Sequence, residues 1–211
     1  MKIGDAKRLT GGGLGKVSKM PGQSYSLSAN KCITGSKLAK IKGSVCSVCY
    51  ALDRGNYQYP SVKISHANHM AALQAPQWAS AMAVLILRGG QNVFRWFDSG
   101  DLQGVWHIEK IVAVCKLTPK VRHWLPTKEL NFVLAYTKAG GLVPGNLVIR
   151  ASGTMIDGPA SKAWPLTSVV WKHIPPANGV HACPAQQQGN ECKDCRACWD
   201  PKVKQVAYHA H

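Results

Sequence analysis

Two hydrophobic periodicities alternate along the central part of the chain. Helical spacing of apolar residues predicts helices over four segments: 62–73, 76–89, 104–116 and 129–138. Short continuous apolar runs predict four buried strands, over 92–97, 121–125, 146–151 and 166–171. A shorter candidate strand, over 25–28, precedes them. Strands that alternate with helices predict βαβ units and a parallel sheet.

The number of these units indicates how the sheet is arranged. Four or five βα units do not fill a closed barrel, which typically needs about 250 residues. The expected fold class is therefore α/β, a partial (open) parallel β/α barrel with an irregular Cys-rich C-terminal segment. The expected organisation is a basic N-terminal arm over 1–31, the partial-barrel domain with a three-cysteine loop over 32–175, and a Cys-rich metal-binding tail over 176–211.

Composition narrows the class of protein. Hydrophobic residues make up 45% of the 211 positions, enough for a core, and no apolar run approaches the roughly 20 residues of a membrane span. The start, Met1 to Asp5, has no apolar signal region, so we expect a cytoplasmic protein with no membrane partner. In a reducing cytosol the eight cysteines favour metal binding over disulfides. Cys115 is the exception, because it lies on an apolar helix stripe and is expected in the core.

The cysteine spacing in the tail is the strongest chemical signal. Cys183, Cys192, Cys195 and Cys198 form a C-x8-C-x2-C-x2-C pattern. Two-residue spacers let successive thiolates turn toward one centre, and this tandem spacing is similar to that of ferredoxin-type iron–sulfur sites. Structural zinc more often uses two C-x2-C pairs separated by a dozen or more residues. We expect a [4Fe-4S] cluster here, with zinc as the alternative and His181 as a further candidate ligand.

Cys32, Cys46 and Cys49 form a second set with C-x13-C-x2-C spacing. Three thiolates leave one coordination position open, where a cluster binds a substrate or cofactor and a catalytic zinc ion binds water. We expect a second iron–sulfur cluster at these cysteines. The alternatives are a zinc site, with His66 or His69 as the fourth ligand, or free thiols.

Polar residues follow two of the predicted strands. Asp98 and Asp101 come at a strand end, the position where parallel α/β sheets bind ligands. They are candidates for ligand or metal binding, and the alternative is a cap for the helix that begins near Gly104. Lys128 and Glu129 follow the next strand, where contact with a polyanion and a place in the first helical turn are the two interpretations.

Two arginines, Arg95 and Arg150, lie within apolar strand patterns. A buried guanidinium is costly unless it is paired. One interpretation is pairing with Asp98, Asp101 or Glu129 inside the fold, and the other is an anion-binding site.

The charge balance suggests a partner. The chain has 26 Lys and Arg against 10 Asp and Glu, a net charge of +16. Nine of the bases lie in the first 42 residues, against Asp5 alone: Lys2, Lys7, Arg8, Lys16, Lys19, Lys31, Lys37, Lys40 and Lys42. Such a flank suits nucleic acid or another polyanion, and the alternative is a solvated surface with a basic bias.

Several motifs together resemble the phage gene-product-88 family over roughly residues 13–200. They are the segment 19–27, Cys32, the segment 46–51, Arg95, the turn 98–101, the segment 126–129, the segment 146–150 and the segment 183–185. This resemblance implies a phage origin, and hence the cytoplasm of the host cell, more firmly than it implies a reaction.

The same pattern is similar to a reduced radical S-adenosylmethionine (SAM) domain, although the first spacer has 13 residues here where that family has three. The resemblance implies that Cys32, Cys46 and Cys49 ligate a catalytic cluster. It further implies five residues that bind SAM. Ser99, Gly100 and Asp101 would meet the methionine amino group, and Arg150 and Ser152 would reach the ribose or carboxylate.

Two functions are therefore expected from the sequence. The first is a phage-type iron–sulfur protein with one or two [4Fe-4S] clusters, SAM as a candidate cofactor, and radical-SAM-like or other redox activity. The alternative is a nucleic-acid-binding protein whose iron–sulfur or zinc centres are structural.

Overall fold

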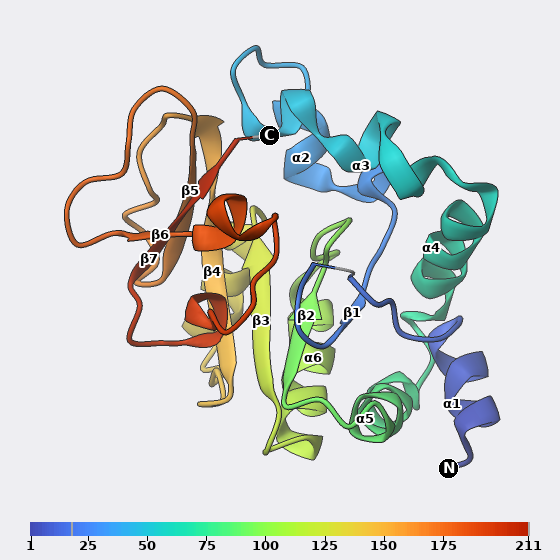
Figure 1. The fold of residues 1–211 in the computed structure, drawn as a ribbon. Helices are drawn as coiled ribbons and strands as arrows, with labels where there is room; N and C mark the ends of the chain where they lie inside the picture. The colour runs from blue at the N-terminus through green and yellow to red at the C-terminus, as the bar shows by residue number, and fades with distance from the viewer. Residues whose placement is uncertain (18, 211) are drawn as a thin grey trace.

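The structure is a computed structural model that describes residues 1–17 and 19–210. The strands are β1 (Gln23–Tyr25), β2 (Val93–Trp96), β3 (Arg122–Thr127), β4 (Leu147–Ile156), β5 (Thr167–Trp171), β6 (His181–Ala182) and β7 (Gln205–His209). They form one open sheet in the order β1-β2-β3-β4-β5-β7-β6, and every neighbouring pair is parallel (Figure 1). The α/β fold with a parallel sheet is confirmed, whereas closure into a barrel is not.

Helices connect and flank these strands. The α-helices are α1 (Ile3–Thr10), α2 (Ile33–Leu38), α3 (Tyr50–Asp53), α4 (Pro60–Ala72), α5 (Trp78–Arg88), α6 (Val105–Leu117) and α7 (Leu130–Lys138). Short 3-10 helices are η1 (Ala29–Lys31), η2 (Val45–Val48), η3 (Gly55–Gln58), η4 (Pro184–Gln188) and η5 (Ala197–Trp199). No helix in the described ranges is long and apolar enough to cross a membrane.

One face of the sheet packs on the helices. Phe94 and Trp96 of β2 belong to a core cluster that also contains Leu125 of β3 and Ile149 of β4. Side chains of α5 and α6 complete the cluster, including Trp78, Met82, Ile108 and Ile111. Alternate residues of a strand point to opposite faces, so the residues between these positions must be covered by something else.

The tail covers the opposite face. Val93 of β2 and Trp124 of β3 cluster there with Trp199 and Val206 from the C-terminal segment. Parallel strands are buried on both faces, which explains why they read as continuous apolar runs. In Figure 1 the orange and red tail lies in front of β3 and β4, whereas α6 lies behind the sheet.

Both ends of the chain take part in the sheet. The segment 1–31 contains α1 and the edge strand β1, which pairs with β2. The segment 176–211 contains β6 and β7, and β7 pairs with β5 over five residues. The polar stretch between β1 and α4 holds α2, α3 and three 3-10 helices, which have no apolar periodicity and so were not predicted.

One buried histidine makes the stability of this core depend on pH. His107 of α6 is fully buried among Trp78, Phe97 and Trp106, and neither ring nitrogen has a hydrogen-bond partner in the described ranges. Burial, with a smaller contribution from Lys110, lowers the pKa of His107 from 6.5 to about 3. Below pH 6.5 the unfolded chain therefore binds a proton that the folded chain excludes.

We expect His107→Phe to reduce the acid sensitivity of the fold. The wild type loses stability as the pH falls through this range, and the phenyl variant should lose about 2 kcal/mol less between pH 7 and pH 5. Urea unfolding at the two pH values measures the difference. An equal loss in both proteins would contradict the assignment.

Candidate metal centres

The three-cysteine loop, residues 32–49, lies across the carboxyl ends of the central strands. Five residues before Cys32, the Leu27 amide donates to the carbonyl of Ser99, in the turn after β2, at 3.0 Å. At its end, Gly43 accepts a hydrogen bond of 2.9 Å from the amide of Ile156, the last residue of β4. Figure 1 shows α2 and α3 beyond this edge of the sheet. Ligand sites of parallel α/β folds lie at this edge.

Glu129 anchors the loop most directly. Its carboxylate is 5% exposed and accepts two hydrogen bonds from Thr34, from the amide at 2.6 Å and from the hydroxyl at 2.7 Å. Thr34 lies two residues after Cys32. Glu129 stands at the start of α7 without capping it, so the carboxylate serves the cysteine loop instead.

The three thiols of the loop lie in one neighbourhood. A Cβ atom on Gly35 would be 3.6 Å from the Cys32 sulfur and 3.7 Å from the Cys46 sulfur. Burial and the neighbouring Asp101, Cys49 and Cys46 raise the pKa of Cys32 to about 12. Lys128 opposes this rise at both Cys32 and Cys46. The site thus combines three thiols with the carboxylates of Asp101 and Glu129 and the ammonium group of Lys128.

The turn after β2 is held in unusual backbone geometry. Phe97 has φ 57° and Gly100 has φ 84°, in the left-handed region. A Cβ atom on Gly100 would lie 2.6 Å from the Leu27 Cβ, so only glycine fits this close approach. Ser99 is 5% exposed, and its buried hydroxyl has no partner in the described ranges. The Ser99–Asp101 turn therefore packs directly beside the segment that leads to Cys32.

Asp101 links the ends of β2 and β3. Its carboxylate accepts from the Thr127 hydroxyl at 2.6 Å and from the Lys128 amide at 2.8 Å. Burial raises its pKa to about 6, although these hydrogen bonds lower it. The helix cap considered from the sequence is wrong, because α6 begins after Gly104 without a side-chain cap.

Asp98 has hydroxyl partners. The Ser24 hydroxyl donates to one carboxylate oxygen at 3.2 Å and the Tyr57 hydroxyl to the other at 3.0 Å. Tyr50, next to Cys49, donates to the Asp98 carbonyl at 3.3 Å. Asp98 and Asp101 therefore hold different parts of this edge together.

The four tail cysteines form a second group on the face of the sheet. The Cys195 sulfur is 3.5 Å from His181 Nε2, and the Cys198 sulfur is 3.1 Å from the Tyr208 hydroxyl. Burial raises the pKa of Cys198 to about 12, and Cys183 and Cys192 contribute to the rise.

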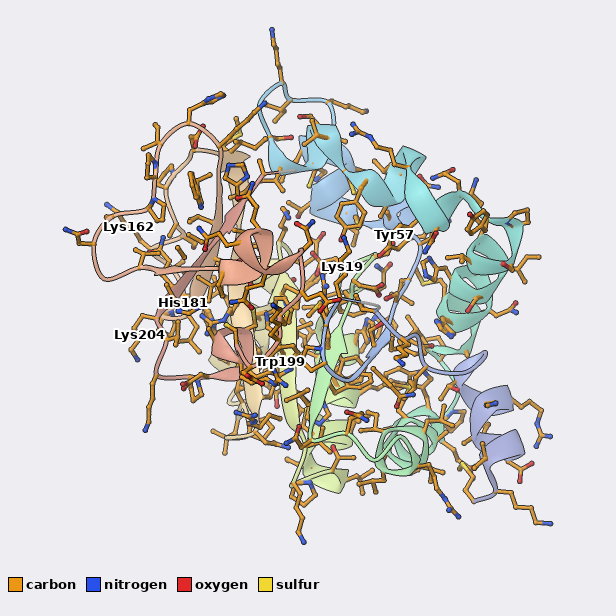
Figure 2. All side chains as sticks on the ribbon, in the orientation of Figure 1. Lys19, Tyr57, Lys162, His181, Trp199 and Lys204 are labelled. Carbon is orange, nitrogen blue, oxygen red and sulfur yellow. The ribbon has the colours of Figure 1, made fainter. Side chains whose placement is uncertain are left out.

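Arg150 ties this tail to the sheet. It is completely buried, and it donates to the carbonyl oxygens of Cys198 at 3.1 Å, Ala197 at 2.8 Å and Asp200 at 2.9 Å. The pairing with carboxylates weighed from the sequence is wrong, since carbonyl oxygens take that place. Trp199 adds a hydrogen bond of 2.8 Å to the Phe94 carbonyl, and Figure 2 labels it within the tail.

The proposed SAM residues divide between the two groups. Ser99, Gly100 and Asp101 lie with the three-cysteine loop, whereas Arg150 points to the tail. Ser152 lies on β4, at the start of an irregularity in its pairing with β5. Cys115 is fully buried in α6, in agreement with its predicted core position.

The cysteine groups are not arranged around a single ion. Within the described ranges, no three Cys, His, Asp or Glu side chains are placed to hold one metal ion. His69 does not join the three-cysteine loop, because its ring nitrogens lie 2.9 Å from the Ser26 carbonyl and 3.2 Å from the Gly13 carbonyl.

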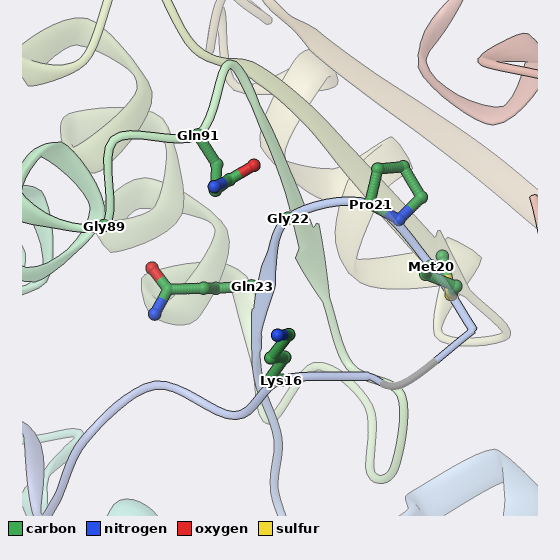
Figure 3. A pocket seen from close by; sticks show the side chains of 7 residues that line it. All are labelled: Lys16, Met20, Pro21, Gly22, Gln23, Gly89 and Gln91. Atoms are coloured by element: carbon green, nitrogen blue, oxygen red, sulfur yellow. The ribbon is translucent and has the colours of Figure 1, made fainter. Parts of the chain in front are cut away.

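A cavity of about 400 Å³ lies at the end of the sheet opposite the three-cysteine loop, and its lining residue Met20 also packs in the cluster of the tail cysteines. It is beside the starts of β1 and β2 and is lined by Lys16, Met20, Pro21, Gly22, Gln23, Gly89 and Gln91 (Figure 3). These residues belong to the end of the sheet opposite the three-cysteine loop.

A family model described as gene product 88 matches residues 2–201. The chain belongs to the gene product 88 family. No curated protein and no solved structure matches it. The resemblance drawn from the sequence is confirmed at the level of this phage gene-product family.

Several residues of this gene product 88 protein gained their roles only through the fold. Thr34 contacts Glu129 across 95 positions, and Tyr208 reaches Cys198 from β7. The sequence contained the weak signal that Glu129 follows a strand, but nothing in it pointed to Thr34.

We expect Glu129→Gln to loosen the three-cysteine loop in this gene product 88 protein. The glutamine side chain would have a single uncharged oxygen, so it could not accept both hydrogen bonds from Thr34 as the carboxylate does. Hydrogen bonds to a charged group contribute about 1.5–3 kcal/mol. Alkylation of Cys32 and Cys46 by iodoacetamide in the metal-free protein should become several-fold faster. Glu109→Gln, at an exposed position of α6, is the matched control. Unchanged alkylation in Glu129→Gln would argue against the anchor.

Proposed function

We propose that this protein is a phage-type iron–sulfur protein with radical-SAM-like or other redox activity. The observation that carries the proposal is the gathering of Cys32, Cys46 and Cys49 at the carboxyl edge of a parallel sheet, beside Asp101 and Lys128. A [4Fe-4S] cluster bound there by three thiolates would supply an electron and one iron with an open position.

The donor set fits a cluster better than a single zinc ion. Zinc draws its thiolate sulfurs to about 2.3 Å, so its ligands must nearly touch. A four-iron core is larger and holds its thiolates farther apart. The three-cysteine set and the tandem C-x2-C-x2-C spacing of the tail are the features that favour a cluster at the two sites.

The tail would hold the second cluster through Cys183, Cys192, Cys195 and Cys198. All four positions would be taken by protein ligands, so this centre would store or pass electrons and would not bind a substrate. The apolar shell around it, which includes Trp199, excludes water and would set its potential.

SAM is the candidate cofactor of the three-cysteine site. The buried Ser99 hydroxyl has no hydrogen-bond partner among the described residues, and a ligand amino group would provide one. Asp101 adds a carboxylate next to the thiols and Lys128 an ammonium group that offsets their negative charge. Arg150 is committed to the tail carbonyls, so Ser99 and Asp101 would contribute most of the recognition.

Metal analysis of anaerobically purified protein tests this proposal. We expect iron and sulfide in excess of zinc, with absorption near roughly 400 nm. Cys46→Ala and Cys195→Ala should each remove about half of the iron, because each disrupts one of two separate centres. SAM titration by calorimetry should then give a signal that Cys46→Ala loses.

Cys115→Ala is the matched control, since Cys115 is a core thiol far from any proposed ligand role. It should leave the iron content unchanged. Equimolar zinc without iron would overturn the proposal, and so would equal iron in all three variants.

The exposed basic surface favours a second candidate, binding of nucleic acid with structural metal centres. Arg8 forms an ion pair with Asp5 at 3.0 Å. The bases Lys31, Lys37, Lys40 and Lys42 are exposed around the three-cysteine loop. They would place positive charge next to whatever the loop binds.

Binding to single-stranded DNA or RNA, measured by fluorescence anisotropy at increasing salt, tests this second candidate. Phosphate contacts release counterions, so the affinity should fall steeply, by about tenfold or more between 50 and 200 mM salt. A flat salt response, or no binding at low salt, would reject it.

A further inference from the structure

Two arginines project from the same face of the sheet, toward the tail. Arg95 of β2 is paired in register with Trp124 of β3, and Arg150 of β4 is paired with Pro126 two residues further on. Because side chains alternate between faces, positions 124 and 126 share one face, and both arginines share it with them. The two guanidinium groups nevertheless have very different surroundings.

Arg150 has a hydrogen-bond partner for every guanidinium nitrogen. Its Nε donates to Cys198, its Nη1 to Thr167 at 3.4 Å, and its Nη2 to Ala197 and Asp200. These carbonyl acceptors explain the presence of a buried cation on purely structural grounds.

Arg95 lacks such partners. Its Nε is buried without any hydrogen bond, and its Nη2 makes none to the described part of the chain. Its Nη1 lies 2.9 Å from the sulfur of Met20, which is a weak acceptor. No carboxylate of the described residues forms an ion pair with it. A half-buried guanidinium left in this state is costly unless an anion completes it.

The groups around Arg95 position it without neutralising it. Its guanidinium carbon stacks 4.9 Å from the centre of the Trp124 ring. Burial lowers the pKa of Arg95, but Tyr50, Asp98, Tyr208 and Tyr57 raise it, with a net rise. Asp98 is the one carboxylate among these groups, and each of its oxygens accepts a hydrogen bond from a hydroxyl group.

Arg95 also lies between the two cysteine groups. Tyr50 adjoins Cys49 in the first group, and Tyr208 contacts Cys198 in the second. Burial raises the pKa of Cys192, and the charge of Arg95 opposes this rise. Figure 2 labels Lys19 and Tyr57, and His181 and Trp199 of the tail lie to the left of them in that view.

More positive charge borders the same region. Met20, which contacts Arg95, lines a cavity of about 210 Å³ together with Lys19, Pro21, Glu191 and Lys193. Two lysines and the carboxylate of Glu191 therefore line the cavity next to Met20, so its lining carries one net positive charge.

We propose that Arg95 binds the carboxylate or phosphate group of a small molecule, between the three-cysteine loop and the tail. The planar guanidinium, held against Trp124, presents two neighbouring donors, Nε and Nη2, that match two oxygens of such a group. A small ligand is favoured over a nucleic-acid backbone because Arg95 is half-buried against Trp124 and Met20. The site would exist whether or not the cysteines hold metal.

Calorimetric titration of the full-length protein tests the proposal, with inorganic phosphate in one arm and acetate in the other, at constant ionic strength. We expect one binding event that Arg95→Gln weakens about tenfold or more, because a charged hydrogen-bonded pair is lost. Arg95→Lys keeps the positive charge but loses the pair of neighbouring N–H donors, and it should weaken binding by several-fold. Arg122→Gln, at an exposed position at the start of β3, is the matched control and should bind as the wild type does.

Stronger binding of phosphate would assign a phosphorylated ligand, and stronger binding of acetate a carboxylate ligand. If Arg95→Gln fails to fold by circular dichroism, the comparison of Arg95→Lys with Arg122→Gln decides. No binding to the wild type, or equal loss in Arg122→Gln, would overturn the proposal. The proposal would also be overturned if Arg95→Gln changed the iron content but left the anion affinity unchanged. The same holds if the protein bound an oligonucleotide through Arg95 but did not bind phosphate.

Discussion

The structure depends on the need to cover both faces of a parallel sheet. Helices cover one face through ordinary apolar packing. The other face is covered by the irregular tail. Arg150 holds the tail there by donating hydrogen bonds to three carbonyl oxygens of the tail and to one of β5. The oxygens of Ala197 and Asp200 also accept backbone hydrogen bonds, from the amides of Asp200 and Val203, so Arg150 adds a further donor to each of them. The second cysteine group is held in place by the same hydrogen bonds.

At the carboxyl edge of the sheet, carboxylates connect separate segments by accepting hydrogen bonds from them. In a chain with only 10 acidic residues, Asp98, Asp101 and Glu129 all accept hydrogen bonds across separate segments. They connect the turn after β2, the turn after β3 and the three-cysteine loop. With these three acids engaged by neutral donors, most of the basic side chains have no acidic partner within the described ranges.

Periodicity predicted the central βαβ units because each strand is buried on both faces and each helix on one. It could not predict α1, α2 or the partners of Thr34, which depend on contacts between segments distant in sequence. The residue types and positions indicated the two cysteine groups and the polar strand ends. Whether Arg150 served a ligand or the tail was decided by the tail's path over the sheet, and no local pattern records that path.

The parallel pairing of β7 with β5 has a consequence for the order of assembly. Strand β7 cannot join the sheet until residue 209 has been synthesised, whereas β1 to β4 need only the first 156 residues. Until then Val93 and Trp124 lack their cover from Trp199 and Val206. During synthesis the protein therefore exposes an apolar surface on one face of a sheet that already contains β1 to β4. Cys32, Cys46 and Cys49 are synthesised before Cys183, Cys192, Cys195 and Cys198.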